Sequence, residues 1–319
     1  MIKKQNSIGR ILRNFVLFPI LGIFILVNII LAVQVNRMLH FGDNPQKLPR
    51  KKVSELTVSD KILGLDQLKR PVYDSLSMPH ETVNLTSEGF NLEAWYADHD
   101  TISRGTALLF HGFGSSKDEC RLAAEFFFKE GYDVLLTDFR AHGNSSGNES
   151  TGGYVEDKDV VTAYRFAESK GARTIVMWGV SMGAATILNA VANDGLQPKK
   201  IFLDCPYGSF LDGTRGFLRM VHAPESPLAE MMMFWGSVEN GQWAFNNQPT
   251  EYAKKVTMPT LLMRGNKDVR VSQAETEAIF KNLATNDKQL VIFDASPHGA
   301  IVKFEKEKWE TTVRAFLNK

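Results

Sequence analysis

TIVMWGVSMGAATILNA, residues 174–190, is the stretch that decides the fold. It reads as a buried strand, Thr174–Val180, followed at once by a helix over Met182–Ala192. A G-x-S-x-G sequence at residues 179–183 joins the two. Small residues on either side of Ser181 let a tight, strained strand-to-helix turn close, and such a turn lifts the serine hydroxyl into the open. This context predicts that Ser181 is a nucleophile rather than part of a purely structural turn.

The sequence on both sides of this stretch alternates between strand-like and helix-like patterns. We expect further strands at Glu81–Thr86, Phe90–Ala97, Thr106–Phe110, Asp133–Phe139, Ile201–Leu203, Thr260–Met263 and Gln289–Phe293. Helical patterns occur at Asp157–Lys170, at Lys303–Leu317, and after Ser116, which forms a capping box with Glu119 and begins a helix ending near Glu130. Short apolar strands separated by helices predict a mostly parallel sheet with helices on both faces. Ligands of such sheets bind at the carboxyl ends of the strands.

Two further candidate residues, Asp268 and His298, each follow a predicted late strand. A serine hydroxyl is a poor nucleophile until a histidine removes its proton, and that histidine needs an acid to fix its tautomer and stabilise its charged form. We therefore predict a catalytic triad in the order Ser181, Asp268, His298. Asp204 also follows a strand and is the rival for the role of the acid. We favour Asp268, because it sits in a Gly-x-x-Asp turn after the following strand.

A glycine loop, HGFG at residues 111–114, follows the strand TALLF. Its glycines let the backbone approach a substrate, so the N–H of Phe113 is a candidate oxyanion donor. The N–H of Met182, which follows the serine and begins a helix, is the other. We interpret His111 as an organiser of this loop rather than as the base, because it precedes the nucleophile in a segment that must present N–H groups.

Taken together, these motifs resemble the α/β-hydrolase superfamily. The resemblance rests on HGFG at 111–114, DFRAHGNS at 138–145, GVSMG at 179–183, Asp268 and His298. It covers about residues 80–319. The second motif is most similar to that of the group containing monoacylglycerol lipases and serine aminopeptidase-like hydrolases. That group usually has glycine where this chain has Ala141. The resemblance implies an α/β-hydrolase fold, a structural role for His142, and a lid inserted here at about 207–256.

The predicted lid segment is rich in methionine and aromatic residues. Four of them are candidates for the wall of an acyl pocket: Met231, Met232, Phe234 and Trp235. Thioethers and aromatic rings adapt to apolar ligands. They are equally expected as the core of a small helical lid, and the two roles are compatible. An aminopeptidase would need a lid carboxylate to hold the substrate amine, for which Glu225, Glu230 and Glu239 are available.

The N-terminal region predicts a membrane anchor. The run from Phe15 to Val35 carries no charge, and a bilayer core needs roughly 20 apolar residues in a helix. Four basic residues and no acid precede it: Lys3, Lys4, Arg10 and Arg13. This bias predicts a single-pass protein with residues 1–14 in the cytoplasm, a span at 15–35, a tether at 36–80 with a short helical patch near Val58–Leu68, and a hydrolase domain at 81–319 on the non-cytoplasmic side. A cleaved signal peptide and a buried core helix are the alternatives.

Composition narrows the functional classes. The chain has 319 residues, 44% of them hydrophobic and 23% charged, with a net charge of +1 and two cysteines. The near-neutral body argues against a nucleic-acid partner, and two cysteines cannot form a disulfide framework, so both are expected as free thiols. Metal-ligand, Walker A and dinucleotide-binding motifs are missing, so we expect neither a metal nor another cofactor.

The sequence therefore predicts a membrane-anchored serine hydrolase that cleaves carboxylic esters, lipid-like esters among them, through an acyl-enzyme at Ser181. The predicted partners are a small acyl-ester or lipid-like substrate and the membrane, while the sequence does not indicate an oligomeric state. A serine aminopeptidase and an acyl thioesterase use the same machinery and remain alternatives. A non-catalytic, membrane-tethered binding module is the alternative from another class of protein.

Overall fold

The centre of the protein is one sheet of eight strands. The computed structural model describes residues 2–48, 57, 64–99 and 102–319. The strands are β3 (Glu81–Ser87), β4 (Phe90–Ala97), β5 (Thr106–Phe110), β6 (Asp133–Thr137), β7 (Ile175–Val180), β8 (Lys200–Asp204), β9 (Thr260–Gly265) and β10 (Lys288–Phe293). They are ordered β10-β9-β8-β7-β5-β6-β4-β3. Every neighbouring pair is parallel except the two that include β4. The mostly parallel sheet predicted from the sequence is confirmed.

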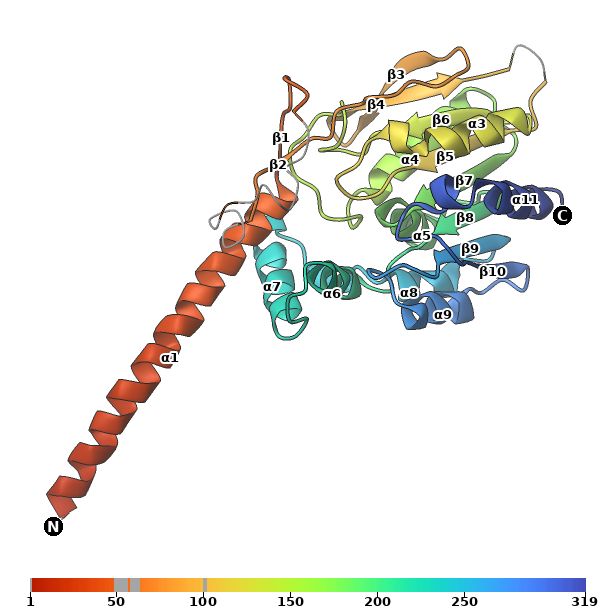
Figure 1. Ribbon diagram of the computed structural model, residues 1–319. Helices are drawn as coiled ribbons and strands as arrows, with labels where there is room; N and C mark the ends of the chain where they lie inside the picture. The colour runs from red at the N-terminus through yellow and green to blue at the C-terminus, as the bar shows by residue number, and fades with distance from the viewer. Residues whose placement is uncertain (1, 49–56, 58–63, 100–101) are drawn as a thin grey trace.

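Helices cover both faces of this sheet (Figure 1). One face carries α4 (Asp157–Ser169), α5 (Met182–Asp194), α8 (Pro249–Tyr252), η4 (Ala253–Lys255) and α9 (Gln273–Asn282), and the other carries η2 (Lys117–Cys120), α3 (Arg121–Lys129), α10 (Ile301–Phe304) and α11 (Lys306–Leu317). Along β5, Leu108 and Phe110 pack on the α4–α5 face, while Ala107 and Leu109 pack on the α3–α11 face. All four are fully buried, which explains why the central strands are continuously apolar rather than alternating.

A small helical layer is formed by the segment that connects β8 to β9 along the chain, where the lid was predicted. It contains α6 (Phe210–Met220), α7 (Leu228–Asn240) and the short η3 (Ala244–Asn246). The end of the predicted insertion behaves differently, because α8 and η4 bury Tyr252 and Ala253 in the main core. The layer that stands apart from the sheet is therefore shorter than the predicted segment.

Two predicted helix boundaries differ from the structure. The Ser116 hydroxyl does not cap a helix, because it donates to Asp118 and accepts from Arg70, and the chain begins there with the 3₁₀ turn η2 instead. The C-terminal helix is broken at Glu305, whose backbone leaves the helical region (φ −133°, ψ 52°). The Glu305 carboxylate accepts hydrogen bonds from the loop that precedes His298, so the break supports the site described below.

The long helix α1 (Ile2–Leu39) meets the body at its C-terminal end and extends away from it toward the N-terminus (Figure 1). Residues Arg13–Leu39 are long and apolar enough to cross a membrane, by length and composition, and a signal sequence has the same properties. The last turns are different: Leu31, Val35 and Leu39 are buried against α7. The helix is thus longer than the predicted span, and its C-terminal end belongs to the packed body.

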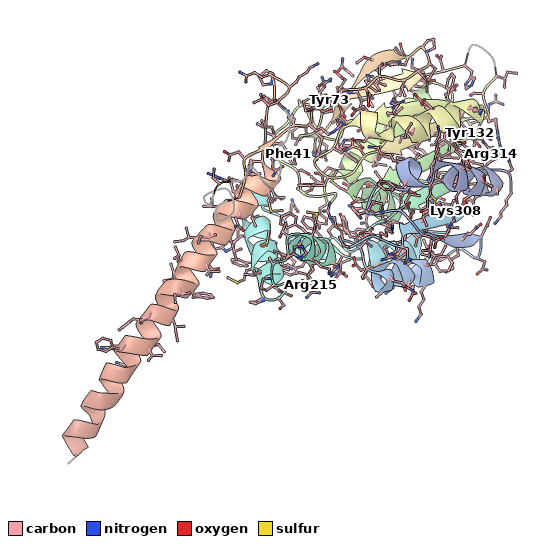
Figure 2. The ribbon with its side chains drawn as sticks, in the orientation of Figure 1. Phe41, Tyr73, Tyr132, Arg215, Lys308 and Arg314 are labelled. Atoms are coloured by element: carbon pink, nitrogen blue, oxygen red, sulfur yellow. The ribbon has the colours of Figure 1, made fainter. Side chains whose placement is uncertain are left out.

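The described part of the predicted tether lies against the body. Phe41, at the junction with α1 (Figure 2), is fully buried and contacts the rings of Phe113 and His142. Lys69 Nζ donates to the carbonyl oxygen of Ser145 at 3.0 Å. Residues 58–63 of the predicted helical patch lie outside the described residues, and its end forms the two-residue strand β2 (Gln67–Leu68), which pairs with β1 (Phe41–Gly42).

Candidate active site

The turn from β7 into α5 holds Ser181 in a strained conformation. Its φ of 53° and ψ of −113° are unusual for a residue with a side chain. The flanking glycines have a steric reason, because α5 crosses β5 and β7 at backbone contact. A Cβ at Gly179 would lie 2.6 Å from the carbonyl carbon of Gly183, and a Cβ at Gly183 would lie 2.3 Å from the carbonyl oxygen of Phe110. The local geometry of the predicted turn is therefore observed.

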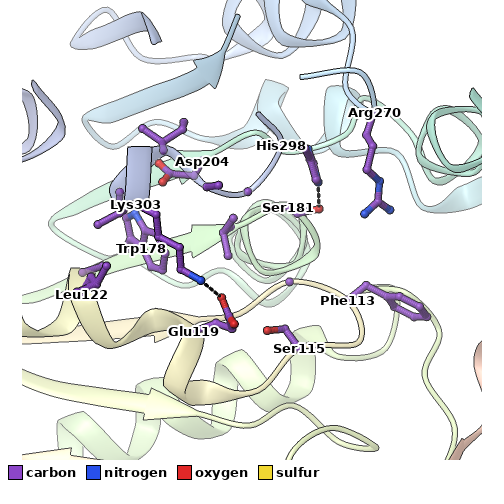
Figure 3. Close-up of a pocket in the computed structure, with 17 residues that line it drawn as sticks. Phe113, Ser115, Glu119, Leu122, Trp178, Ser181, Asp204, Arg270, His298 and Lys303 are labelled. Carbon is purple, nitrogen blue, oxygen red and sulfur yellow. Dashed lines mark hydrogen bonds and ion pairs between the residues drawn. The ribbon is translucent and has the colours of Figure 1, made fainter. Parts of the chain in front are cut away.

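Ser181, His298 and Asp268 come together at the carboxyl ends of β7, β9 and β10. Nε2 of His298 lies 2.9 Å from Oγ of Ser181 (Figure 3), and Nδ1 lies 2.7 Å from Oδ2 of Asp268. The Asp268 side chain is fully buried and the His298 side chain is 13% exposed. A histidine placed between a hydroxyl and a buried carboxylate can accept the hydroxyl proton through Nε2 while Nδ1–H stays bonded to the acid.

Asp268 is held as a carboxylate. Burial raises its pKa, but the hydrogen bond and charge of His298, with the backbone N–H groups of Arg270 and Val271, hold the pKa below its usual value. Those two N–H groups donate to Oδ1 at 2.8 and 2.9 Å. Both oxygens of the carboxylate are thereby engaged, so the carboxylate keeps one orientation toward His298.

Asp204, the rival acid, forms no hydrogen bond or ion pair with His298, whose ring is bonded to Asp268 and Ser181. Its side chain is fully buried beside Trp178 and Trp309, and burial raises its pKa to about 8 despite the opposing indole N–H groups. Asp204 lines a cavity of about 140 Å³, which is also lined by Ser181 and His298 (Figure 3). An acid that is largely protonated at neutral pH is poorly suited to stabilising an imidazolium.

The glycine loop at 111–114 is anchored by two buried histidines. Nε2 of His111 accepts from the N–H of Phe139 at 3.1 Å, and Nε2 of His142 accepts from the N–H of Gly114 at 2.9 Å. In each ring Nδ1 faces a backbone carbonyl, so both rings are donors at Nδ1 and acceptors at Nε2. Burial lowers the pKa of each to about 4. Neutral histidines here hold the loop and lie apart from the proton path.

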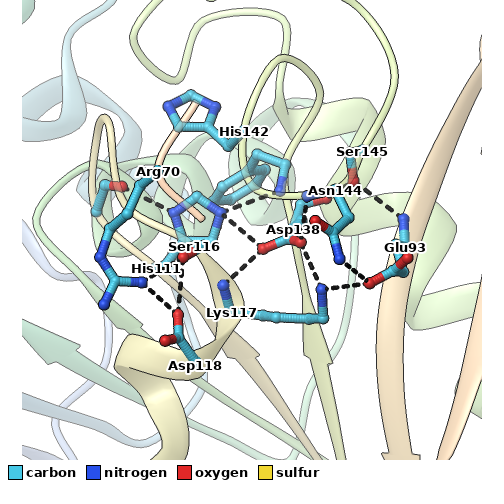
Figure 4. A network of polar contacts seen from close by, with 12 residues as sticks. Arg70, Glu93, His111, Ser116, Lys117, Asp118, Asp138, His142, Asn144 and Ser145 are labelled. Atoms are coloured by element: carbon cyan, nitrogen blue, oxygen red, sulfur yellow. Dashed lines mark hydrogen bonds and ion pairs between the residues drawn. The ribbon is translucent and has the colours of Figure 1, made fainter. Parts of the chain in front are cut away.

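A polar network around Lys117 and Asp138 adjoins the same loop (Figure 4). Nζ of Lys117 lies 2.6 Å from Oδ2 of Asp138 and 2.8 Å from Oε1 of Glu93. Asp138 also accepts from the N–H groups of Lys117 and Asn144. One buried aspartate therefore ties the segment after β5 to the segment after β6, and this explains why the DFRAHGNS motif accompanies the glycine loop.

The two residues predicted as oxyanion donors, Phe113 and Met182, line one cavity together with Ser181. Met182 is the first residue of α5, where a backbone N–H has no partner within the helix. The cavity has a volume of about 280 Å³ and is largely apolar. Its position over Ser181 makes it the natural place for the acyl part of a substrate.

Only one of the four predicted pocket residues lines this cavity. Met232 does so, whereas Met231 and Trp235 pack against the apolar cluster shared by α1, α6 and α7, and Phe234 is 47% exposed. The other three do not line this cavity, because neighbouring residues of a helix point in different directions. Most of the cavity wall comes from residues outside the four candidates, including Val35, Met38, Leu39, Tyr207, Phe210, Phe217, Met220 and Met233.

Two other groups beside the triad were not singled out from the sequence. Arg270 lines both cavities, and its guanidinium forms no hydrogen bond or ion pair within the described part of the chain. Cys205 is fully buried near Asp268 and His298. Burial holds the pKa of its thiol well above the usual value, so this cysteine is a poor metal ligand and a poor nucleophile.

Comparison with known proteins agrees with this architecture. A family model described as the alpha/beta hydrolase fold matches residues 108–236, which include Ser181. A carboxylesterase of Bacillus subtilis (strain 168) is 24% identical over 226 residues, covering 66% of this chain and 92% of its own. The YqkD protein of the same organism, described as uncharacterized, is 25% identical over 256 residues, covering 77% and 82%.

The esterase Pf2001 of Pyrococcus furiosus has a similar structure. It superposes with a TM-score of 0.64 at 25% identity, covering 78% of this chain and 98% of its own. The chain has the α/β-hydrolase fold, and the matching family model and the similar structure are both of alpha/beta hydrolases. Its esterase neighbours support a hydrolase function.

Proposed function

We propose that the protein is a membrane-anchored serine hydrolase that cleaves carboxylic esters, with Ser181 as nucleophile, His298 as base and Asp268 as the acid. The observation that carries the proposal is the continuous contact from Oγ of Ser181 through His298 to Asp268, at 2.9 and 2.7 Å, beside an apolar cavity. The carboxylesterase and esterase among the similar proteins point to the same reaction class.

The reaction follows from this geometry. Oγ of Ser181 attacks the acyl carbonyl while Nε2 of His298 takes the hydroxyl proton. The tetrahedral intermediate collapses, the C–O bond of the ester breaks, and the alcohol leaves with the proton held by His298. A water molecule then gives its proton to His298 and attacks the acyl-enzyme. The carboxylic acid departs and the proton returns to Ser181.

We propose the N–H groups of Phe113 and Met182 as the donors that stabilise the negative oxygen of both intermediates. Both residues lie beside Ser181 in the wall of the cavity. The His111 and His142 rings fix the backbone of the glycine loop, so the Phe113 N–H is placed before the substrate arrives. Loss of one such donor typically costs on the order of 10²–10³ in turnover.

The lid contacts favour an esterase over an aminopeptidase. Glu225 is paired with Arg219 at 2.9 Å and Glu230 with Arg215 at 2.6 Å, while Glu239 accepts from Asn36. None of the three glutamates lines the cavity over Ser181. The carboxylates that would hold a substrate amine are therefore engaged elsewhere, and an ester or thioester with an apolar acyl group fits this wall better.

We further propose that α1 anchors the protein, with the N-terminus in the cytoplasm and the body on the other side. The uncharged run and the four basic residues that precede it support this assignment. Alkaline extraction of membranes separates an integral protein from a processed, soluble one. Protease protection of tagged termini in sealed vesicles then gives the orientation.

The catalytic assignment is tested with the full chain in detergent micelles and its Ser181→Ala variant. Both are treated with a fluorophosphonate probe and assayed on p-nitrophenyl esters, an acyl thioester and aminoacyl amides. We expect labelling and ester turnover in the wild type and neither in the variant. A folded wild type that resists the probe and leaves every ester intact would refute the proposal and favour a binding module.

A further inference from the structure

The cavity over Ser181 is closed on one side by the helix that we assign to the membrane. Val35, Met38 and Leu39 of α1 line it together with residues of α6 and α7. We propose that the last two turns of α1 form part of the acyl-binding site, and that the substrate is a single-chain ester amphiphile drawn sideways from the bilayer. This inference rests on the proposed function and adds a substrate class and a route.

The contact between α1 and α7 is close enough to be a permanent wall. At Gly236 an added Cβ would be in ordinary van der Waals contact, 3.6 Å from Val35 and 3.7 Å from Leu39, so about one methyl group separates the two helices at this small residue. The indole N–H of Trp235 donates to Oδ1 of Asn28 at 3.2 Å. An apolar contact near Gly236 combined with a polar tie at Asn28 fixes α7 along α1 over several turns.

The charges on α1 place this wall at the membrane surface. Arg13 and Arg37 bracket an uncharged segment that is about 36 Å long at 1.5 Å per residue, against roughly 30 Å for the hydrocarbon core. Both ends of the segment therefore reach the headgroup level, where arginine side chains are stable. Val35, Met38 and Leu39 all lie within one turn of Arg37, so the cavity wall begins where the hydrocarbon ends.

The surface of α7 supports the same placement. Phe234 and Val238 are 47% and 58% exposed, and Trp243 follows shortly after the helix with 53% exposure. Aromatic side chains are enriched at the boundary between membrane and water. Phe234 contacts the ring of Trp235, which meets Asn28, so it continues the apolar surface of α1. Val238 lies beside Glu239, which contacts Asn36 near the end of α1.

The size and lining of the cavity define the substrate class. A volume of about 280 Å³ is near the lower end of the range for ligand sites, and it suits one acyl chain better than two. A long chain must pass Met38 and Leu39 to reach deep into the cavity, whereas an acetyl group needs only the space beside Ser181. The α1 wall should therefore matter for long-chain esters and not for short ones.

The test uses the full chain reconstituted in phosphatidylcholine vesicles and two substrates with one leaving group, 4-methylumbelliferyl oleate in the bilayer and 4-methylumbelliferyl acetate in water. Met38→Trp fills the cavity from α1, Met38→Leu keeps its volume, and Ile25→Trp places the same ring on an exposed part of the helix. We expect Met38→Trp to lower oleate turnover by about tenfold or more and acetate turnover by less than about threefold. Ile25→Trp should resemble the wild type, and Met38→Leu should restore oleate turnover relative to Met38→Trp, because it removes the added bulk from the wall.

The outcomes separate the two proposals. If Met38→Trp lowers both activities equally, or neither, while Ser181 still reacts with the fluorophosphonate probe, the α1 wall is refuted and the hydrolase proposal stands. If Met38→Trp no longer reacts with the probe, Met38→Ala decides: an enlarged cavity should shift the preferred acyl length upward, and an unchanged length profile refutes the wall. A wild type that hydrolyses neither ester and resists the probe refutes the proposed function itself.

Discussion

Replacing Gly183 by alanine should disable the protein without changing any member of the triad. The added Cβ would lie 2.3 Å from the carbonyl oxygen and 2.7 Å from the carbonyl carbon of Phe110, and 2.8 Å from the carbonyl oxygen of His111. Ordinary contacts begin at 3.4 Å, so the closest of these is about 1.1 Å too short. All three atoms belong to the backbone of β5 and the following loop, which is central in the sheet and cannot yield as a flexible side chain would.

The first turn of α5 must therefore move by roughly 1 Å, and Ser181 moves with it. A displacement of this size typically costs about 10²-fold in rate, and overpacking costs about 1–3 kcal/mol, or a melting temperature lower by roughly 2–12 °C. The assay measures kcat and KM on p-nitrophenyl butyrate beside thermal unfolding. Gly22→Ala, where nothing lies within 4 Å of the new methyl group, is the control. Activity within about threefold of the wild type at an unchanged melting temperature would show that this backbone contact does not position the nucleophile.

Two further predictions concern ionisable groups. Asp268→Asn should lower kcat by on the order of 10³–10⁴-fold because the amide cannot stabilise a charged His298. The kcat of Asp204→Asn should stay within about tenfold of the wild type, because an acid with a pKa of about 8 is already mostly neutral at pH 7. Kinetics on one ester compare the two variants, and equal losses would contradict the assignment. The depressed pKa of His111 and His142, about 4 in the fold against 6.5, means that the unfolded chain binds protons first as the pH falls. The contribution of each neutral histidine to the free energy of unfolding is then complete above pH 6.5 and is lost as the pH falls toward 4. At pH 5 the loss is on the order of 2 kcal/mol for each group. Urea unfolding between pH 7.5 and 5 measures this loss; His142→Gln should flatten the pH dependence, and an equally steep curve for that variant would contradict the prediction.

The features that the sequence predicted well are local ones. Thr174–Val180 and Met182–Ala192 were placed correctly to within two residues, since Ile175–Val180 and Met182–Asp194 are observed. Both the strand pattern and the G-x-S-x-G turn lie within a few neighbours along the chain, so no distant contact is needed to recognise them. The approach of Asp268 and His298 to Ser181 also followed from a general property, because parallel strands deliver their following loops to one edge.

The features that the sequence missed depend on distant partners. Ser116 and Glu119 have the spacing of a capping box, but Arg70, which is remote in sequence, takes the Ser116 hydroxyl and pairs with Glu119 at 2.9 Å. A real capping box forms instead at Ser272 and Glu275, at the start of a helix that was not predicted. A spacing rule gives the opportunity for a cap, and tertiary contacts decide whether it is used.

The composition of α1 predicts a membrane span, but it does not predict that the end of the helix packs against α7 and lines the cavity over Ser181. Hydropathy counts apolar residues along a helix, and it gives the same answer whether they meet lipid, protein or substrate. Only packing separates these cases: Phe15, Phe18 and Phe24 are exposed, whereas Leu31 and Val35 are buried against α7. In the membrane arrangement that we propose, α1 changes from lipid-facing to protein-facing within its last turns, and the cavity over Ser181 begins there. The same apolar side chains that would hold the anchor in the bilayer thus give the acyl site its wall, so shortening the helix to obtain a soluble enzyme would remove part of the site.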